Sequence, residues 1–361
     1  MSEKIVLLTY YYPPDQSAGS ERSQNLIKAL TKVDKNSNYW ILTSIPNRYG
    51  QWMFNRKYKR KTKIRYGEVE VNIKSIWVPF LGNGLIASSI SYLFYFFQVI
   101  PTLLILKPTI IISTSAKIIT ALLGAISSRL LNSKLYIDLR DTFSDNYFYF
   151  YRWKKRIFLV GILNLFERFV FESATSINLV SKGFEEAYFG FPKKNSNQPK
   201  SFTYFSNGIS KNFRKSIKNI PKKKKNTFNL IYAGNLGEAQ DIFSMINKLS
   251  KQKQKVETLI KDNIRIYIYG SGCQLDKINT LIKENKNNIS KLIKYKGLIK
   301  KSEIPEVYAS ADCLLLPLNE FKSLSMVIPT KIFEYCATTC PILYSSNGFT
   351  NKFISKIDCV K

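Results

Sequence analysis

Short apolar runs of strand length alternate with helical stretches throughout this chain. The opening shows the pattern: residues 5–12 are expected to form a buried strand, 13–20 a loop, 21–32 a helix with apolar residues at helical spacing, and 39–44 a second strand. A strand-loop-helix-strand order favours a parallel sheet with helices on its faces. The first constraint on the chain is therefore an α/β fold.

The second half repeats this order. Strands are expected at residues 228–233, 264–269, 293–298 and 313–316, with helices between them. The 361 residues suffice for two domains of ordinary size. Residues 211–225 hold eight basic residues and no acidic one, which is typical of an exposed linker or domain edge. We therefore expect one domain over 1–210 and a second over 211–361.

The composition excludes several kinds of chemistry. The chain has no histidine, so Ser-His-Asp and Cys-His catalysis and imidazole zinc sites are ruled out. Its five cysteines are scattered without a CxxC pair, which argues against a disulfide framework and favours a reducing cytoplasm. The first apolar run is too short for a signal peptide.

The charge is strongly unbalanced. Fifty-five Lys and Arg against 25 Asp and Glu give +30, which attracts nucleic acid, anionic lipid or phosphorylated small molecules. Residues 56–65 pack seven basic residues into ten positions. This run fits either a patch facing anionic lipid or a phosphorylated acceptor, or a solvated loop.

Residues 82–106 contain no charge and leave three interpretations open. They are long enough to span a membrane, but serines, Gln98 and Pro101 interrupt them. A buried or half-buried helix and a helix lying in the membrane interface are the alternatives. Residues 147–171, aromatic and basic, are expected to form a long helix facing a membrane or another domain.

The segment 328–335 carries the most suggestive pair of charges. We expect a helix with Pro329 at its first position, which places Lys331 and Glu334 on one face. An ammonium beside a helix start could bind a diphosphate, and the carboxylate could accept hydrogen bonds from ribose hydroxyls. The alternative is a solvated ion pair.

Other candidate residues follow predicted strands. In Asp138-Leu139-Arg140-Asp141, Arg140 could clamp a phosphate and Asp141 could orient a hydroxyl, or the charges pair with each other. Gly19 would let backbone approach a phosphate. The loops 234–240 and 270–272 are glycine-rich, and no Asp-x-Asp pair is present to hold a metal on a nucleotide diphosphate.

The order of these motifs resembles the family 4 glycosyltransferases, and within them the bacterial enzymes of surface polysaccharide (O-antigen and capsule) synthesis. The resemblance covers nearly the whole chain. It is carried by Tyr12-Pro13-Pro14 with Ala18-Gly19-Ser20, Asp138-Leu139-Arg140-Asp141, Asn207-Gly208, Tyr232-Ala233-Gly234-Asn235-Leu236-Gly237, Tyr269-Gly270-Ser271-Gly272 and Pro329-Thr330-Lys331-Ile332-Phe333-Glu334-Tyr335.

The resemblance implies a GT-B architecture, in which two Rossmann-like domains with parallel sheets face each other across a cleft. It implies transfer of a sugar, with retention and without a metal or other cofactor, from a nucleotide sugar, by subgroup a UDP-sugar. The acceptor would be polyprenyl-diphosphate-linked or an oligosaccharide, at the anionic inner face of the cell membrane. We expect Asp138, Arg140 and Asp141 to be catalytic residues. The expected donor-binding residues are Gly19, Ser20, Asn235, Gly237, Gly270, Gly272, Thr330, Lys331 and Glu334.

The chain departs from the family pattern in three places. The Arg and Lys that many members carry in the loop 234–240 are missing, with Asn235 and Gln240 there instead. Met326 stands where many members carry a second glutamate, eight positions before Glu334. The sequence also stops at Lys361, before the helix that closes the second domain in the family, so a truncated, inactive member is one alternative. Nucleotide-sugar 2-epimerases share the fold but use histidine. A nucleic-acid-binding protein has no supporting motif, so we expect no nucleic-acid partner.

Overall fold

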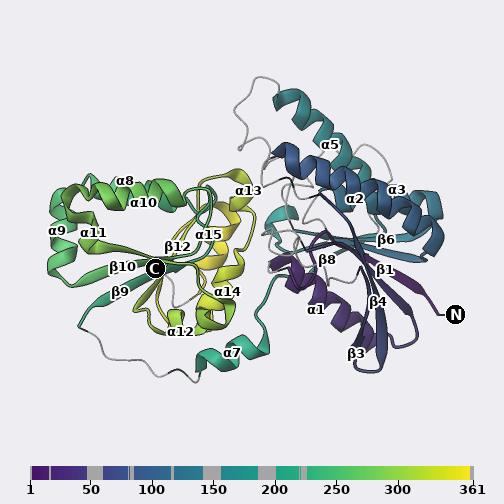
Figure 1. The fold of residues 1–361 in the computed structure, drawn as a ribbon, viewed down its shortest axis with the longest axis horizontal. Helices are drawn as coiled ribbons and strands as arrows, with labels where there is room; N and C mark the ends of the chain where they lie inside the picture. The colour runs from purple at the N-terminus through teal and green to yellow at the C-terminus, as the bar shows by residue number, and fades with distance from the viewer. Residues whose placement is uncertain are drawn as a thin grey trace. The chain divides into compact units, whose positions relative to one another are not determined.

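The computed structural model describes residues 2–15, 18–46, 60–79, 81, 85–114, 118–140, 156–185, 201–218, 220 and 226–357. The chain forms two compact units, Met1–Ser206 and Asn207–Lys361. Each unit is a twisted, mainly parallel sheet with helices on its two faces (Figure 1). The predicted α/β class with two Rossmann-like domains is confirmed. The sequence placed the division after residue 210, and the units divide after residue 206.

The sheet of the first unit has the order β3-β4-β2-β1-β5-β6-β7-β8. All neighbouring strands are parallel except β3 and β4. Strand order reverses at β1, so the neighbouring carboxyl ends of β1 and β5 form the switch point of this sheet. The strands are β1 (Lys4–Leu8), β2 (Asn38–Ser44), β3 (Lys61–Tyr66), β4 (Val69–Ile76), β5 (Ile110–Thr114), β6 (Lys134–Leu139), β7 (Ser176–Leu179) and β8 (Ser201–Tyr204).

Four described helices cover this sheet. They are α1 (Ala18–Val33), α2 (Leu85–Leu106), α3 (Ile118–Leu131) and α5 (Arg156–Ser173). In Figure 1, α2, α3 and α5 lie on one side of the sheet and α1 on the other. Helix α1 turns Ser23, Ile27 and Thr31 inward, four residues apart along one face, and all three are buried. The long helix expected at 147–171 is described only from Arg156 onward.

The basic run at residues 56–65 falls partly on an edge strand. Residues 56–59 lie outside the described part of the chain, and Lys61 begins β3, which pairs antiparallel with β4. Most of β3 is exposed, and Lys63 forms an ion pair of 2.7 Å with Glu70 across the two strands. Lysines on an exposed edge strand discourage pairing with another sheet. The sequence analysis interpreted residues 56–65 from their charge alone and so missed this hairpin, although Val69, Val71 and Ile73 alternate along β4.

The second unit has a five-stranded parallel sheet in the order β11-β10-β9-β12-β13. Its strands are β9 (Phe228–Ala233), β10 (Ile264–Tyr269), β11 (Ile293–Gly297), β12 (Cys313–Pro317) and β13 (Ile342–Ser345). The order reverses between β9 and β12, so ligands of such a sheet are expected beyond the carboxyl ends of these two strands.

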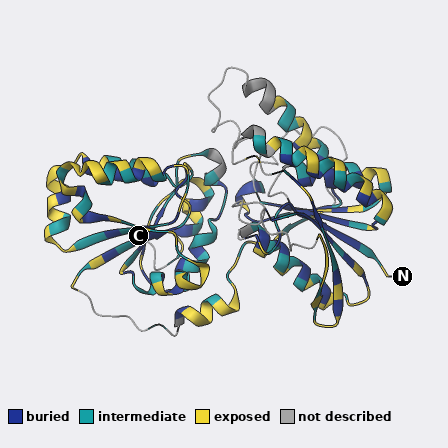
Figure 2. Cartoon of the chain, in the orientation of Figure 1, coloured by how far each residue is buried: buried dark blue, intermediate teal, exposed yellow. Residues whose placement is uncertain are grey.

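Two apolar clusters, one on each face, hold this second sheet between its helices. Figure 2 shows buried and half-buried residues along the strands and many exposed residues on the outer sides of the helices. The helices are α7 (Lys211–Lys218), α8 (Ile242–Ser250), α9 (Lys253–Lys261), α10 (Leu275–Glu284), α11 (Ile289–Leu292), α12 (Ile304–Ala309), α13 (Lys322–Ser325), α14 (Thr330–Cys336) and α15 (Gly348–Ile354), with short 3-10 turns at Lys286–Asn288 and Lys301–Glu303.

Of the two interpretations of residues 211–225, a linker or the start of the second domain, the structure supports the second for residues 211–218. Lys211–Lys218 forms α7, because Phe213 and Ile217, four residues apart, pack on the core of the second unit. Lys211, Arg214 and Lys215 of the same helix are exposed. The many basic residues of this segment made its amphipathic pattern, which has only the two apolar positions Phe213 and Ile217, hard to identify from the sequence.

Candidate functional site

Lys331 and Glu334 lie together at the switch point of the second unit. Helix α14 begins at Thr330. Pro329, predicted at the first position of the helix, instead precedes it in an extended conformation. Ile332 and Tyr335 are buried against the sheet. Since side chains three residues apart share a helix face, Lys331 and Glu334 lie together on a face that the core leaves open.

The ammonium of Lys331 lies directly over the loop that follows β9. A Cβ atom at Gly234 would run into Nζ and Cε of Lys331, so only glycine leaves room for the lysine here. Nζ also lies 5.7 Å from the ring centroid of Tyr232, on the strand before that glycine. Burial lowers the pKa of Lys331, and the nearby carboxylate of Glu334 opposes that change.

Glu334 is positioned by a buried tyrosine. The Tyr308 hydroxyl on α12 donates a hydrogen bond of 3.1 Å to Oε2 of Glu334. Tyr308 is fully buried, with its ring edge against Tyr335 at a centroid distance of 5.1 Å. Burial raises the pKa of Glu334, while Lys331, the Tyr308 hydrogen bond and Lys301 act to lower it.

The two charges do not neutralise each other in a salt bridge. Within the described ranges, neither Lys331 nor Glu334 forms an ion pair shorter than 4.0 Å. A half-buried cation and a half-buried anion are thus held on one helix face by separate contacts. This arrangement suits a ligand that carries a phosphate and a pair of hydroxyls.

The glycine loops of this unit pack on each other. Gly270 has φ +129°, and a Cβ there would strike the carbonyl oxygen of Gly234. A Cβ at Gly272 would likewise strike the backbone of Leu236. These glycines permit close backbone approach between the loops after β9 and β10. Their predicted role beside the nucleotide base stays a prediction.

The remaining donor residues of this unit make local contacts. The side-chain amide of Asn235 donates a hydrogen bond of 3.4 Å to Oε1 of Gln240. A Cβ atom at Gly237 would lie 2.5 Å from Nδ2 of Asn235. The Thr330 hydroxyl accepts a hydrogen bond of 3.4 Å from the Asn207 amide. Their predicted contacts with a donor also stay predictions.

In the first unit, Gly19 and Ser20 lie inside α1 rather than in the loop that we expected. The helix begins at Ala18, and Ser20 is completely buried in its first turn. Arg140 follows β6 and is half-buried, whereas Asp141 lies outside the described residues. Among the described residues, the candidate pair Lys331 and Glu334 of the second unit shares one helix face, whereas the candidates of the first unit lie on separate elements.

Asp138 is held by a network of hydrogen bonds within the first unit. Arg22 on α1 pairs with both carboxylate oxygens, each at 2.7 Å, and the Asn178 amide donates to Oδ1 at 2.7 Å. Arg22 also donates to the backbone carbonyls of Phe205 and Ser206 at 2.8 and 3.0 Å. Asp138 is buried and has three donor contacts, which gives it a structural role beside its predicted catalytic one.

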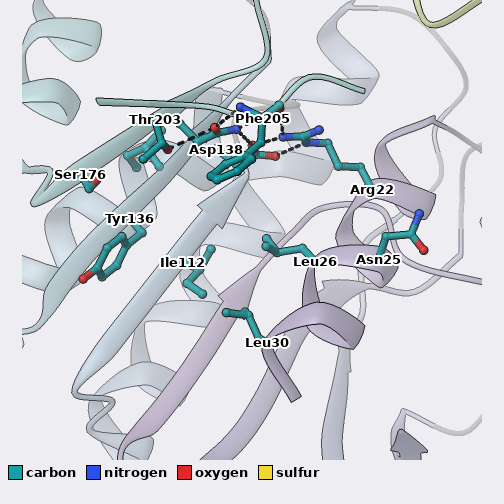
Figure 3. Close-up of a pocket in the computed structure, with 12 residues that line it drawn as sticks. Arg22, Asn25, Leu26, Leu30, Ile112, Tyr136, Asp138, Ser176, Thr203 and Phe205 are labelled. Carbon is teal, nitrogen blue, oxygen red and sulfur yellow. Dashed lines mark hydrogen bonds and ion pairs between the residues drawn. The ribbon is translucent and has the colours of Figure 1, made fainter. Parts of the chain in front are cut away.

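This network closes one end of a pocket of about 330 Å³ (Figure 3). The pocket lies between α1 and the strands β5 to β8, and its wall is mostly apolar. The lining residues nearest the network are Arg22, Asn25, Phe205 and Asn178, and those at the apolar end are Leu26, Leu30, Ile112 and Tyr136.

The sequence analysis assigned no role to three residues of the C-terminal site, Tyr308, Tyr232 and Gly234, although the last two belong to a motif of the resemblance. Only a three-dimensional structure shows where the two tyrosine hydroxyls lie. Gly234 did leave a signal, because it follows a buried strand directly, but its match to Lys331 depends on packing. Among the described residues, no cluster of three or more His, Cys, Asp or Glu side chains could hold a metal ion.

Comparisons with known proteins agree with this geometry. Residues 213–357, nearly the whole second unit, match the family model described as glycosyl transferases group 1. No curated protein sequence matches the chain significantly.

Several solved structures share the fold. Sucrose-phosphate synthase from Thermosynechococcus elongatus superposes with a TM-score of 0.69 at 12% identity, over 98% of this chain and 83% of that one. The Anabaena protein HepE, in complex with UDP, gives 0.59 at 12% identity over 97% and 83%. The lipopolysaccharide outer core galactosyltransferase WaaB gives 0.55 at 12% identity over 97% and 83%.

The fold is therefore GT-B, built from two Rossmann-like units. The second unit carries a group 1 glycosyltransferase domain, and the chain is an enzyme of the glycosyltransferase class.

Proposed function

We propose that this enzyme transfers a sugar from a UDP-sugar, with retention of configuration, through a donor site built on Lys331 and Glu334. The observation that carries the proposal is the pair of unbridged charges on α14, with Lys331 seated over Gly234 and Glu334 held by Tyr308. Lys331 would contact the diphosphate, and Glu334 would accept hydrogen bonds from the ribose hydroxyls. The solved complex of HepE with UDP supports the choice of nucleotide.

For the acceptor we propose a polyprenyl-diphosphate-linked or oligosaccharide substrate of cell-surface polysaccharide synthesis. The enzyme would act at the cytoplasmic face of the membrane. The likeness to a lipopolysaccharide galactosyltransferase and the +30 charge support this assignment. We propose that the reaction needs no metal, since Lys331 would offset charge on the leaving diphosphate.

A thermal-shift screen tests the donor proposal. The purified protein is heated with UDP, GDP, ADP or their sugar conjugates, with and without EDTA. A ligand that binds only the folded state at 100 times its dissociation constant adds about 2.7 kcal/mol of stability. We expect UDP and UDP-sugars to raise the Tm equally with and without EDTA. A shift only with GDP or ADP, or none at all, contradicts the proposal, and no shift would favour an inactive family member.

The pH dependence of UDP binding tests the roles of the two charges. Binding needs ionised Glu334, whose pKa burial raises above 4.5, and protonated Lys331, whose pKa burial lowers below 10.5. Affinity should therefore fall on the acidic side as Glu334 gains a proton, and on the basic side as Lys331 loses one. We expect Tyr308→Phe to move the acidic fall to higher pH, because a hydrogen bond that lowers the Glu334 pKa is lost.

Calorimetric titration of wild type and Tyr308→Phe over the same pH series makes this comparison. The titration of UDP itself is common to both proteins and cancels. Identical pH profiles would show that Tyr308 does not position Glu334.

A further inference from the structure

Helix α2 presents an uninterrupted apolar stripe to the outside of the first unit. Within its charge-free sequence, the stripe consists of Ile90, Leu93, Phe94, Phe97, Pro101, Leu104 and Ile105, at the spacing of a single helix face. Phe97 is 69% exposed and Ile105 81%. Over these 16 positions the stripe is roughly 24 Å long at 1.5 Å per residue.

The opposite side of α2 is fixed to the sheet. Tyr95, Val99 and Leu103 are completely buried, and the Tyr95 hydroxyl donates to the carbonyl of Leu42 on β2 at 2.9 Å. Thr102 accepts a hydrogen bond of 2.8 Å from Lys74 on β4. By length and composition the segment Ser89–Leu106 could cross a membrane. A crossing helix would have to leave this packing, so the structure favours a half-buried helix with one free apolar side.

Further exposed apolar residues lie on the same side of the first unit as the stripe. Trp77 directly follows the last residue of β4 and is partly exposed. Its ring lies edge-on to Phe94, with the ring centroids 5.6 Å apart. Helix α5, on the same side of the sheet, exposes Leu165 and Phe166 (Figures 1 and 2). Aromatic residues beside an apolar face are typical of segments that lie at a membrane–water interface.

The stretch of sequence that contains α2 carries charges of one sign only. Residues 71–137 contain no Asp or Glu and carry five basic residues, Lys74, Lys107, Lys117, Arg129 and Lys134. Lys107 is exposed immediately after the end of α2, and Arg129 is exposed on the neighbouring helix α3. Two copies of this surface would repel each other, whereas anionic headgroups would be attracted to it.

We propose that the α2 stripe docks the enzyme on an anionic lipid bilayer, with the helix in the plane of the interface and its apolar side among the acyl chains. The exposed basic residues Lys107 and Arg129 then meet the headgroups. This inference deepens the proposed function by giving a lipid-linked acceptor a surface on which to meet the enzyme. Vesicle binding tests it without any turnover, so it can fail or succeed independently of the donor site.

The test is flotation of the full chain with vesicles of phosphatidylcholine alone, or of equal parts phosphatidylcholine and phosphatidylglycerol. The variant Leu93→Gln/Phe97→Gln/Ile105→Gln changes three exposed residues of the stripe. The control Val33→Gln/Leu298→Gln changes two equally exposed apolar residues elsewhere in the chain. Tm values and the UDP-induced shift of each protein report whether both units remain folded.

We expect wild type and the control to float with the anionic vesicles and to bind neutral ones weakly. The triple variant should partition into the anionic vesicles at least roughly tenfold less, since it loses three apolar insertions. Unchanged flotation of the triple variant overturns the proposal, and so does equal binding to neutral vesicles. A wild type that ignores vesicles but forms a dimer that the triple variant loses would assign the stripe to a contact between copies instead.

Discussion

Glu334→Gln is expected to weaken UDP binding by roughly tenfold to a hundredfold, because charge-assisted hydrogen bonds contribute about 1.5–3 kcal/mol. Glutamine keeps the size of the side chain and still accepts the Tyr308 hydrogen bond. It removes the negative charge that would bind the ribose hydroxyls. Isothermal titration calorimetry with UDP measures the change, and Glu306→Gln, an exposed carboxylate on α12, is the matched control.

Although Glu334→Gln should weaken UDP binding, it should not lower the stability of the folded protein. The folded-state pKa of Glu334 is raised, so the folded protein binds the proton more tightly than the unfolded chain. The free energy of unfolding therefore falls as pH rises from 4.5 through that raised pKa, and the cost of the buried charge is present at neutral pH. Glu334→Gln should keep or raise the Tm at neutral pH. A large drop in Tm would instead assign Glu334 to the framework of the unit, and unchanged UDP affinity would move the donor site elsewhere.

Arg22→Leu is expected to destabilise the first unit by about 3 kcal/mol, because it leaves the carboxylate of Asp138 buried without its cation. The loss also frees the carbonyls of Phe205 and Ser206 from their donor. Urea unfolding, with hydrogen exchange followed in β6 and β7, measures the effect. Arg168→Leu is the matched control, since its ion pair with Glu172 is exposed and such pairs contribute under about 1 kcal/mol.

The same network separates two roles for Asp138. A catalytic Asp138 predicts that Asp138→Asn loses turnover while the Tm of the first unit stays the same. A framework role predicts that the Tm falls and that turnover, measured well below it, survives. If Arg22→Leu and Arg168→Leu prove equally mild, the network contributes little to stability.

The sequence predicted the architecture well because apolar periodicity decides an α/β fold. Buried strands such as β1 and β9 are short apolar runs, and their pattern was clear. The hairpin of β3 and β4 and the helix α7 were missed because the basic residues of both regions were interpreted before their apolar positions. In β4 the alternation of Val69, Val71 and Ile73 was visible in the sequence, whereas α7 has only two apolar positions, Phe213 and Ile217.

Part of the donor site could also be predicted, because Lys331 and Glu334 are three residues apart and share a face on any helix. Tyr308 is 26 residues from Glu334, and Gly234 is 97 residues from Lys331, so these matches depend on the order of the strands. The Arg22 contact to Asp138 spans 116 residues and was invisible for the same reason. Spacing in the sequence predicts which residues lie together within one helix or strand, whereas contacts between different elements require the three-dimensional structure.

The Arg22 network has a consequence for how the chain folds. It ties the start of α1 to carbonyls 183 and 184 residues further along. Contacts of such long range close a large loop, and the entropy lost in closing it slows folding. During synthesis, the first unit can therefore close its sheet only once β8 has left the ribosome. The strands of the second unit all lie within Phe228–Ser345, so less chain has to be synthesised between its first strand and its last.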